Sequence, residues 1–386
     1  MKTSALPLIA YSHLRWDFVF QRPQQILSRM ARSRPVLFVE EPIYTEDAAR
    51  LDVSVPAPNI LRCVPHGALA GEPFSAEQVE LIAPLLARLV ESTGYRRHVA
   101  WMYTPMALPL ARRLAPAAIV YDCMDELSLF KGASPTLRER EADLFRVCDA
   151  VFTGGPSLYR AKRDRHPNVH CFPSSVDVAH FARARTPQTP SPTRPRLGFF
   201  GVIDERLDRE LLGAVAAARP DWQFVMLGPI VKIDPASLPR PENILYLGQR
   251  DYDALPAYLS DWDVCLMPFA LNDATRFISP TKVLEYMAAE RPIVSTPIAD
   301  VVQPYGDIVR IASSPQDFVA ACEAALTEPP LERARRFARM REVLTRTSWD
   351  ATVSHMAALV DDLLQPQGEL PWQSPTLSSS APVRPV

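Results

Sequence analysis

Residues 279–296 read SPTKVLEYMAAERPIVST, and this stretch decides the predicted fold. Ser279 and Pro280 predict the start of a helix, because a serine hydroxyl caps free backbone N–H groups and proline suits the first turn. Good helix formers follow, Arg-Pro at 291–292 ends the helix, and residues 293–296 read as a short buried strand. The stretch is therefore a cap, a helix, a turn and a strand.

Two charged side chains of this helix predict a ligand site. Lys282 lies in the first turn, where free N–H groups favour an anion, and Glu285 projects from nearly the same face. Such a pair suits a ribose joined to a diphosphate, because a carboxylate accepts hydrogen bonds from vicinal hydroxyls. A solvated Lys–Glu pair on a surface helix is the alternative. The preceding strand, residues 263–269, and its polar loop, residues 271–277, favour the ligand, because open α/β sheets bind ligands at the carboxyl ends of their strands.

The sequence DVCLMPF at 263–269, followed by residues 279–296, resembles the nucleotide-sugar-binding signature of retaining glycosyltransferases of the family 4 (group 1) type, which have the GT-B fold. The resemblance implies that Glu285 holds the donor ribose. The family usually has a second acidic residue eight positions earlier, against the donor sugar, where this chain has Phe277. Asn272 and Asp273 of the same loop are the candidate substitutes.

Composition sets broad limits on the class of protein. A chain of 386 residues is too long for one compact core, and 47% hydrophobic with 22% charged residues is an ordinary globular composition. The formal net charge of −2 gives no general attraction to nucleic acid. The six cysteines are scattered without metal-ligand spacing, so we expect free thiols in a reducing compartment and no metal site.

Targeting signals are weak along the chain. The apolar run before His13 is too short for a secretory signal, and no window of about 18 residues is continuously apolar. We therefore expect a cytoplasmic protein. Arg112-Arg113 and the basic segment 160–165 motivate the hypothesis that it contacts the inner membrane peripherally, with solvated helix faces as the alternative.

Strands and helices alternate along most of the chain, which predicts parallel sheets wrapped by helices. Proline at nearly every other position marks residues 185–195 as a linker. With the resemblance, this predicts an α/β protein of the GT-B type, in which two Rossmann-like domains face a cleft. The predicted units are an acceptor domain (1–184), the linker (185–195), a donor domain (196–345), a helix that returns to the first domain (346–365) and a disordered tail (366–386).

The loop at 13–21 follows the first predicted strand and reads HLRWDFVFQ. So many polar side chains in one loop indicate a binding role, with coverage of the domain edge by the aromatic residues as the alternative. The segment WDFVFQRPQ is similar to the opening of a subset of bacterial polysaccharide glycosyltransferases, in which this loop lines the interdomain cleft. We predict catalytic roles for His13 and Asp17, and cleft or acceptor contacts for Arg15, Trp16, Gln21 and Arg22.

Three carboxylates follow another predicted strand, at Asp122, Asp125 and Glu126. Carboxylates gathered at a strand end raise one another's pKa unless a cation or sugar hydroxyls satisfy them. Related enzymes show YD-x-x-D here. Asp125 is the third catalytic candidate, while Asp122 either joins it or caps the next turn.

The predicted donor domain opens with the strand LGFFGVI, in which Gly201 allows the backbone to approach a phosphate. Arg206 is placed to neutralise a diphosphate, with an ion pair to its acidic neighbours as the alternative. The family usually adds a lysine where this chain has Asp208, so Lys282 is expected to carry more of the charge. The donor-binding candidates are Gly201, Arg206, Gly248, Asn272, Asp273, Ser279, Thr281, Lys282 and Glu285.

These patterns predict a hexosyltransferase that moves a sugar from a nucleoside diphosphate sugar to a polysaccharide or lipid-linked glycan acceptor, without a metal or other cofactor. Lys282 and Arg206 would stabilise the departing diphosphate, and the resemblance implies retention at the anomeric carbon. Two alternatives stay open. One is a sugar-nucleotide epimerase on the same fold, and the other is a non-catalytic GT-B scaffold that binds a partner, for which Phe277 and Asp208 are the best support.

Overall fold

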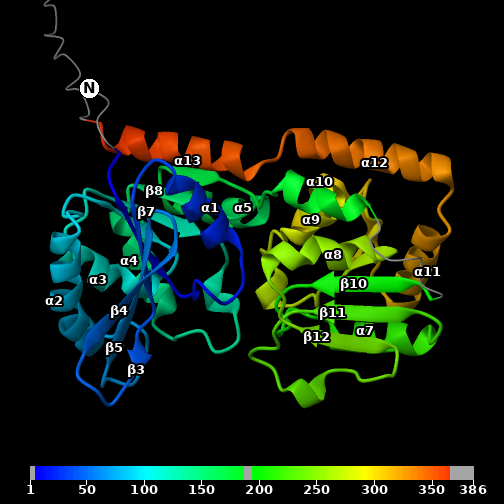
Figure 1. Ribbon diagram of the computed structural model, residues 1–386, viewed down its shortest axis with the longest axis horizontal. Helices are drawn as coiled ribbons and strands as arrows, with labels where there is room; N and C mark the ends of the chain where they lie inside the picture. The colour runs from blue at the N-terminus through cyan, green and yellow to red at the C-terminus, as the bar shows by residue number, and fades with distance from the viewer. Residues whose placement is uncertain (1–4, 187–193, 366–386) are drawn as a thin grey trace, which may run out of the picture.

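The computed structural model describes residues 5–186 and 194–365 (Figure 1). Most of the expected linker, residues 187–193, and the expected tail, residues 366–386, lie outside the described residues. Two predominantly parallel sheets, each wrapped by helices, form the two halves of the molecule (Figure 1). The predicted α/β class with two Rossmann-like sheets is confirmed.

The first sheet has the strand order β3-β5-β2-β1-β6-β7-β8-β9, with β4 paired to β5. Its central strand β1 is buried along its whole length, as expected of a parallel strand covered on both faces. The strands are β1 (Leu8–Ser12), β2 (Val36–Glu40), β3 (Ile43–Tyr44), β4 (Arg50–Ala57), β5 (Ile60–Gly67), β6 (Val99–Met102), β7 (Ala118–Cys123), β8 (Ala150–Thr153) and β9 (Val169–Cys171).

Strands β3 and β4 are absent from the sequence-based expectations. β4 is the antiparallel member of the sheet, and it joins β5 through a tight turn in which Asn59 has a φ of 61°. The alternation of Leu51, Val53 and Val55 with polar residues is a strand signal. Val53 and Val55 point to solvent, so this alternation does not mark a core strand.

Two apolar clusters cover opposite faces of the first sheet. One contains Ile9 and Tyr11 of β1 with residues of α2, α3 and α4, and the other contains Leu8 and Ala10 with residues of α1 and α13 (Trp349–Leu363). This division follows from the period of two along a strand. The helices of this half are α1 (Arg22–Met30), α2 (Ala76–Ser92), α3 (Leu108–Arg113), α4 (Leu137–Val147) and α5 (Pro156–Lys162), with short 3₁₀ turns η1 (Pro105–Ala107), η2 (Leu127–Leu129) and η3 (Arg163–Arg165).

The second sheet has the order β12-β11-β10-β13-β14-β15, and all its strand pairs are parallel. Its strands are β10 (Arg196–Phe200), β11 (Gln223–Leu227), β12 (Ile244–Gly248), β13 (Val264–Met267), β14 (Ile293–Ser295) and β15 (Arg310–Ile311). The helices are α6 (Val178–Ala182), α7 (Arg209–Ala218), α8 (Leu255–Ser260), α9 (Lys282–Ala288), α10 (Ala299–Tyr305), α11 (Pro315–Leu326) and α12 (Pro330–Thr345), with 3₁₀ turns η4 (Arg183–Arg185), η5 (Pro235–Ser237), η6 (Tyr252–Ala254) and η7 (Asp273–Thr275). The helix and strand expected within 279–296 are therefore present as α9 and β14.

The last two helices run along the same side of both halves (Figure 1). Met340 of α12 is buried in the core of the second half, whereas α13 (Trp349–Leu363) places Trp349 and Met356 in a cluster of the first sheet. The buried Arg34 also pairs with Asp361 of α13 at 2.7 Å. The chain therefore crosses back to the first half after α12.

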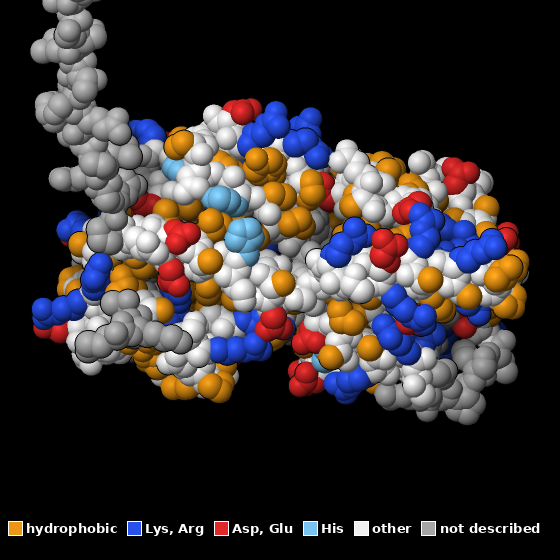
Figure 2. All heavy atoms as spheres, turned by 90° about the horizontal axis from the view of Figure 1, so that it is seen from above, with side chains coloured by type: hydrophobic (Ala, Val, Ile, Leu, Met, Phe, Trp, Pro, Cys, Tyr) orange, Lys and Arg blue, Asp and Glu red, His pale blue; other side chains and the backbone are white. Residues whose placement is uncertain are grey.

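Figure 2 shows Lys and Arg side chains gathered over the second half, on the side of α12. Several of these charges are already paired within the fold. Arg341 makes two hydrogen bonds to Glu290, at 2.8 and 2.9 Å, and Arg336 pairs with Glu328.

Two features of the structure bear on the hypothesis of membrane contact, namely the helices and the basic segment 160–165. No helix within residues 5–186 and 194–365 is long and apolar enough to cross a membrane. In the basic segment 160–165, Lys162 is buried between Glu126 and Glu141, and Arg165 also pairs with Glu141 at 2.6 Å. These two charges stabilise the fold, so they are not free to meet an anionic surface.

The strand orders locate the ligand-binding edge of each sheet. The order changes direction at β1 in the first sheet and at β10 in the second. Open α/β sheets bind ligands beyond the carboxyl ends of the strands at such a point. The residues that follow these two strands, His13 and Gly201, therefore lie at the ligand-binding edges of the two sheets.

Candidate active site

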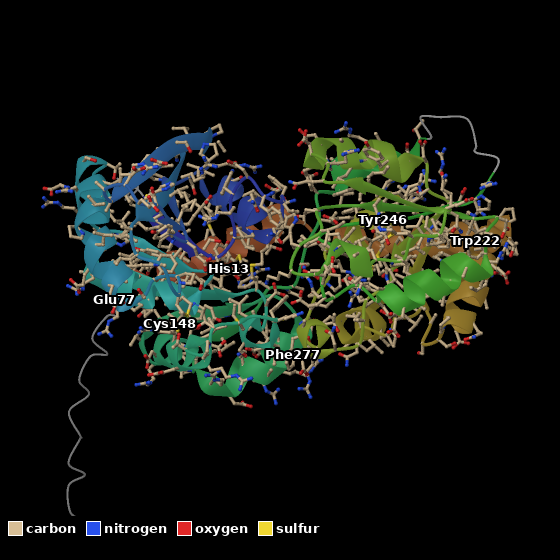
Figure 3. All side chains as sticks on the ribbon, turned by 90° about the horizontal axis from the view of Figure 1, so that it is seen from below. His13, Glu77, Cys148, Trp222, Tyr246 and Phe277 are labelled. Carbon is tan, nitrogen blue, oxygen red and sulfur yellow. The ribbon has the colours of Figure 1, made fainter. Side chains whose placement is uncertain are left out.

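Two adjoining cavities lie between the two halves. The small cavity, about 120 Å³, is lined by Gly201, Lys282 and Glu285 of the second half and by Phe20 of the first. The large cavity, about 640 Å³, is lined by His13 and Asp125 of the first half and by loops of the second. Gln21, Val202 and Arg206 line both, so the two cavities are continuous. Figure 3 shows His13 within the first half and Phe277 at the junction of the halves.

Glycines shape the end of β10. Gly201 and Gly228 have φ values of +137° and +142°, which side-chain-bearing residues rarely adopt. A Cβ on Gly201 would overlap Cε and Nζ of Lys282, and a Cβ on Gly228 would overlap the carbonyl oxygen of Gly201. The two glycines therefore let the backbone and the Lys282 side chain share one narrow space.

Replacement of Gly201 tests this close approach. We expect Gly201→Ala to weaken nucleoside diphosphate binding about 10-fold or more, because the new methyl group displaces the Lys282 ammonium, with a backbone strain of about 1–3 kcal/mol. Gly94→Ala is the control for a positive φ, since Gly94 has a φ of +77°, a Cβ added there would meet nothing within 4 Å, and the residue lines neither cavity. Calorimetric titration and urea unfolding of both variants measure the two effects. Equal nucleotide affinity in both variants would contradict the predicted role of the Gly201–Lys282 contact.

Lys282 and Glu285 face the small cavity from the same side of α9. Burial raises the pKa of Glu285 and lowers the pKa of Lys282, and attraction between the two charges opposes both shifts. Glu285 Oε2 is buried and has no hydrogen-bond partner among the described residues. A buried carboxylate oxygen without a partner is costly, so this atom is suited to a ligand that donates hydrogen bonds.

The structure is compatible with both sequence-based interpretations of Arg206, as a diphosphate contact and as an ion-pair partner of an acidic neighbour. Its guanidinium donates to the Asp204 carboxylate at 2.7 and 2.9 Å, so the pair with an acidic neighbour exists. The same side chain lines both cavities. Asp204 therefore holds the guanidinium in place at the junction of the cavities, where its remaining N–H groups are directed to a ligand.

Two of the titratable groups that the first half contributes to the large cavity are the catalytic candidates His13 and Asp125. Burial lowers the pKa of His13 to about 4, with a further contribution from the charge of Lys232, and Nδ1 of His13 is buried without a partner in the part of the chain that the structure describes. Burial raises the pKa of Asp125 to about 6, against the attraction of Arg206. A neutral imidazole and a weakly acidic carboxyl group therefore face the same space.

The raised pKa of Asp125 predicts a pH-dependent stability. Its carboxyl group favours folding below about pH 4, and this contribution is lost as the pH rises through about 6, because the buried group then ionises. Asp125→Asn removes that loss, so the variant is expected to exceed the wild type by about 2 kcal/mol in unfolding free energy at pH 7.5 and to match it near pH 4. Urea unfolding at both pH values measures the difference. A variant that is less stable at pH 7.5 would contradict the expectation.

Four of the six candidates in and beside the first loop lie away from both cavities. Asp17 is exposed and pairs with Arg62. Arg15 donates to Glu40 at 3.0 Å, and Trp16 packs edge-on against Phe38. The structure thus gives no support to a catalytic Asp17 or to cleft contacts of Arg15 and Trp16, because their partners on and near β2 and β5 hold the loop from outside.

Arg22 is the fourth of these candidates, and it is buried. Its guanidinium donates to Asp122 at 2.8 and 3.1 Å and to the carbonyl oxygen of Phe172 at 2.9 Å. Asp122 is fully buried, so it neither caps a turn nor joins Asp125 in the cavity. The Arg22–Asp122 pair therefore stabilises the first sheet beneath the cavities and does not contact a ligand. The remaining loop candidates, His13 and Gln21, line the cavities.

Four donor-binding candidates also lie outside the two cavities. Asn272 caps η7 and donates to the carbonyl oxygen of Glu205 at 2.9 Å, and Asp273 is exposed on the same turn. Gly248 has a φ of +71° at the end of β12, while its neighbours Gln249 and Arg250 line the small cavity instead. The expectation that Ser279 caps the helix is wrong, because α9 begins at Lys282 and the carbonyl oxygen of Ser279 accepts from Ser174 at 2.6 Å. The structure therefore places Gly201, Arg206, Thr281, Lys282 and Glu285 around the small cavity.

The two departures from the family pattern have structural roles here. Phe277 packs against an apolar cluster of the first half, and Arg276 lies 5.7 Å from its ring centroid. Asp208 caps α7 by accepting from the backbone N–H of Leu211 at 2.9 Å. Neither residue lines the cavities, so the structure offers no acidic group in place of Phe277 and no diphosphate contact at Asp208.

One residue of the small cavity, Tyr252, carried no sequence signal for a ligand site. Tyr252 of η6 lies 4.5 Å from Phe20, ring to ring, and its hydroxyl accepts from Gln25 at 2.9 Å. His180 stacks on the same tyrosine ring at 4.3 Å. Tyr252 thus joins the two halves at the small cavity through Gln25 and Phe20, which lie 227 and 232 residues away in sequence and which local patterns do not reveal.

Comparison with known proteins agrees with this geometry. The family model of group 1 glycosyl transferases matches residues 194–328, which contain β10 to β15 and α9. A protein of Bacillus subtilis (strain 168), named as the teichuronic acid biosynthesis glycosyltransferase TuaH, is 26% identical over 290 residues, covering 69% of this chain and 72% of that protein. The chain is therefore a glycosyltransferase whose residues 194–328 match group 1.

Solved structures show that the transferase has the GT-B fold. Sucrose-phosphate synthase (tll1590) from Thermosynechococcus elongatus is similar with a TM-score of 0.67 and 17% identity, covering 93% of the transferase and 99% of that chain. A trehalose-6-phosphate structure from E. coli bound with UDP-2-fluoro glucose has a TM-score of 0.66 and 15% identity over 93% of the transferase and 99% of that chain.

The family model covers the donor side of the candidate site but not the side that the first half forms. The matched residues 194–328 include Arg206, Lys282 and Glu285, whereas His13 and Asp125 precede them. The roles of individual residues in the transferase stay predictions on both sides. Among the described residues, no three His, Cys, Asp or Glu side chains are grouped as a metal site requires.

Proposed function

We propose that the transferase moves a hexose from a nucleoside diphosphate sugar to a polysaccharide or lipid-linked glycan, with retention at the anomeric carbon and without a metal ion. The named role of the Bacillus subtilis relative in teichuronic acid biosynthesis supports a polysaccharide product. The UDP-2-fluoro glucose bound to the E. coli protein of the same fold supports a nucleoside diphosphate donor.

One observation carries the donor assignment. The buried Glu285 Oε2 lacks a partner in the described structure, and it faces a cavity that Lys282 and Gly201 also line. A ribose with two vicinal hydroxyls donates to both oxygens of such a carboxylate. The adjacent ammonium and the glycine backbone suit the diphosphate that follows the ribose.

The departing diphosphate would lie next to two cations of the second half, Lys282 and Arg206. Transfer leaves negative charge on the departing diphosphate, and preorganised cations stabilise this charge in the transition state. Lys282 lines the small cavity, and Arg206 lines both cavities while Asp204 fixes its guanidinium. The proposal therefore places the diphosphate at the junction, with the donor sugar and the acceptor in the large cavity.

The size of the small cavity implies that the cleft opens for the donor. Its volume is about 120 Å³, whereas small-molecule sites span roughly 300–1,000 Å³. Phe20 and Gln25 of the first half close it through Tyr252 of the second. We therefore expect donor entry to separate these contacts and donor binding to restore them.

A thermal-shift panel tests the proposal. Wild-type protein is heated with UDP-, GDP- and dTDP-linked hexoses, each with and without EDTA. We expect one nucleotide class to raise the Tm in both conditions, because a ligand that binds the native state stabilises it. A shift that EDTA abolishes would contradict metal independence, and the absence of any shift would favour the non-catalytic scaffold.

A further inference from the structure

Two lysines at the wall of the large cavity are not paired with acidic residues. Lys131 of the first half and Lys232 of the second both line this cavity. The described residues include no carboxylate within ion-pair distance of either ammonium, whereas Arg206 of the same cavity is paired with Asp204. Two cations thus remain available to a ligand.

Two cations of the large cavity, Lys232 and Arg206, lie close to the ring of Phe130. Lys232 Nζ lies 5.3 Å from the centroid of this ring, and Arg206 Cζ lies 5.5 Å from it. The next residue, Lys131, donates its backbone N–H to Glu205 at 3.2 Å. Cations over an aromatic face are held by the ring quadrupole, so Phe130 positions charges of the second half against the first.

The backbone at Lys232 is held in an unfavourable conformation. Its φ is 60°, in the left-handed region that a lysine rarely adopts. The preceding residue is anchored, because Val231 donates to the carbonyl oxygen of Ile203 at 3.0 Å. Residues in this conformation are enriched at active sites and ligand-binding loops, although Asn59 and Glu290 adopt it away from both cavities.

The acidic groups of the large cavity fall into two sets. Asp204 is bound by Arg206, and Glu72 is bound by the hydroxyls of Ser134 and Thr136. Glu41 and Asp125 face the same cavity, and burial raises their pKa values to about 7 and about 6. Both carboxyl groups exchange hydrogen bonds with sugar hydroxyls, and Glu41, which has the higher pKa, is partly neutral at pH 7 and therefore repels a nearby anion less than a free carboxylate does.

We propose that the acceptor of the transferase carries a phosphate or carboxylate group, and that Lys232 and Lys131 bind this anion beside Phe130. The inference rests on the proposed function and names the substrate class of the same site. The hydroxyls of the acceptor sugar then lie toward Glu41, Asp125 and His13, and the anion lies at the lysines. Lysine ammonium groups suit either anion, because each acts as a point charge with three donors.

Equilibrium titration tests the lysine site. Full-length protein, saturated with the nucleoside diphosphate that stabilises it, is titrated with glucose, glucuronate, glucose 6-phosphate and dihexanoyl phosphatidylglycerol. We expect an anionic ligand to bind at least 10-fold more tightly than glucose. Lys232→Gln should abolish this advantage, Lys232→Arg should keep it, and Lys131→Gln should reduce it. Arg240→Gln is the control, since it removes an exposed cation that lines neither cavity.

The arms distinguish the source of the anion. If glucose 6-phosphate binds most tightly, the anion belongs to a sugar phosphate. If glucuronate binds most tightly, it belongs to a uronate, and if the phospholipid binds most tightly, it belongs to a lipid-borne phosphate. Equal binding of glucose and all anionic ligands, or an advantage that persists in Lys232→Gln, overturns the inference. If no nucleotide binds, the proposed function fails by itself, and the same titrations of the nucleotide-free protein still decide the lysine site.

Discussion

Glu285→Ala is expected to weaken nucleoside diphosphate binding about 100-fold. The variant loses two hydrogen bonds from the ribose to a buried carboxylate, each worth about 1.5 kcal/mol or more, and about 1.4 kcal/mol is a factor of ten in affinity. Glu285 is 7% exposed, and its Oε2 is without a partner in the described chain, so little of the fold depends on it. Isothermal titration of wild type and variant with the preferred nucleotide measures the change.

Two further variants sharpen this test. Glu285→Gln keeps the shape and one acceptor oxygen, so its affinity should lie between those of the alanine variant and the wild type. Glu290→Gln changes a second glutamate just after α9, where Arg185 and Arg341 hold it outside both cavities. Glu290→Gln should bind like the wild type, and a loss comparable to that of Glu285→Ala would contradict the assigned donor site.

Arg22→Met is expected to destabilise the fold by about 3–5 kcal/mol, because it leaves the carboxylate of Asp122 buried without its partner. Arg22 and Asp122 are 5% and 0% exposed, and the shortest N–O distance between them is 2.8 Å. Methionine preserves most of the volume, so lost charge pairing dominates over lost packing. Urea unfolding at neutral pH measures the loss.

The double variant Arg22→Met/Asp122→Leu separates structural support from ligand contact. Replacing both charges by apolar groups removes the uncompensated carboxylate, so we expect much of the lost stability to return. If Arg22 instead contacts the acceptor, as the sequence predicted, Arg22→Met would keep wild-type stability and reduce sugar transfer.

Five of the nine donor-binding candidates line the small cavity, and these follow local rules of sequence. Lys282 and Glu285 lie three positions apart on a helix, and helical geometry places both on the same face. Gly201 ends a strand at the point where the sheet order reverses. These relations involve residues close in sequence or standard features of an open sheet, so patterns suffice to find them.

The acceptor side is harder to predict because distant partners decide the direction of each side chain. Arg15, Asp17 and Arg22 follow His13 closely, yet they turn to Glu40, Arg62 and Asp122, which lie 25, 45 and 100 residues away. Within the same loop only His13 and Gln21 among the candidates reach the cavities. No short-range pattern separates a ligand-facing side chain from a buried ion pair.

Other cavity residues give no local signal at all. Lys232, Glu41 and Tyr252 belong to loops and turns without a motif. They meet only because the two halves close on each other, as in the contact between Tyr252 and Phe20. Conversely, Asn272 and Asp273 look suited to a sugar, but the cap of η7 turns them to another surface.

A crystal structure of the transferase with its preferred nucleoside diphosphate sugar tests the central claim most directly. We predict that the ribose hydroxyls lie within hydrogen-bonding distance of both Glu285 carboxylate oxygens, with the diphosphate between Lys282, Arg206 and the Gly201 backbone. The sugar should enter the large cavity beside Asp125. A nucleotide bound elsewhere, or a Glu285 carboxylate that the ribose does not reach, would contradict the donor site on which the proposed function rests.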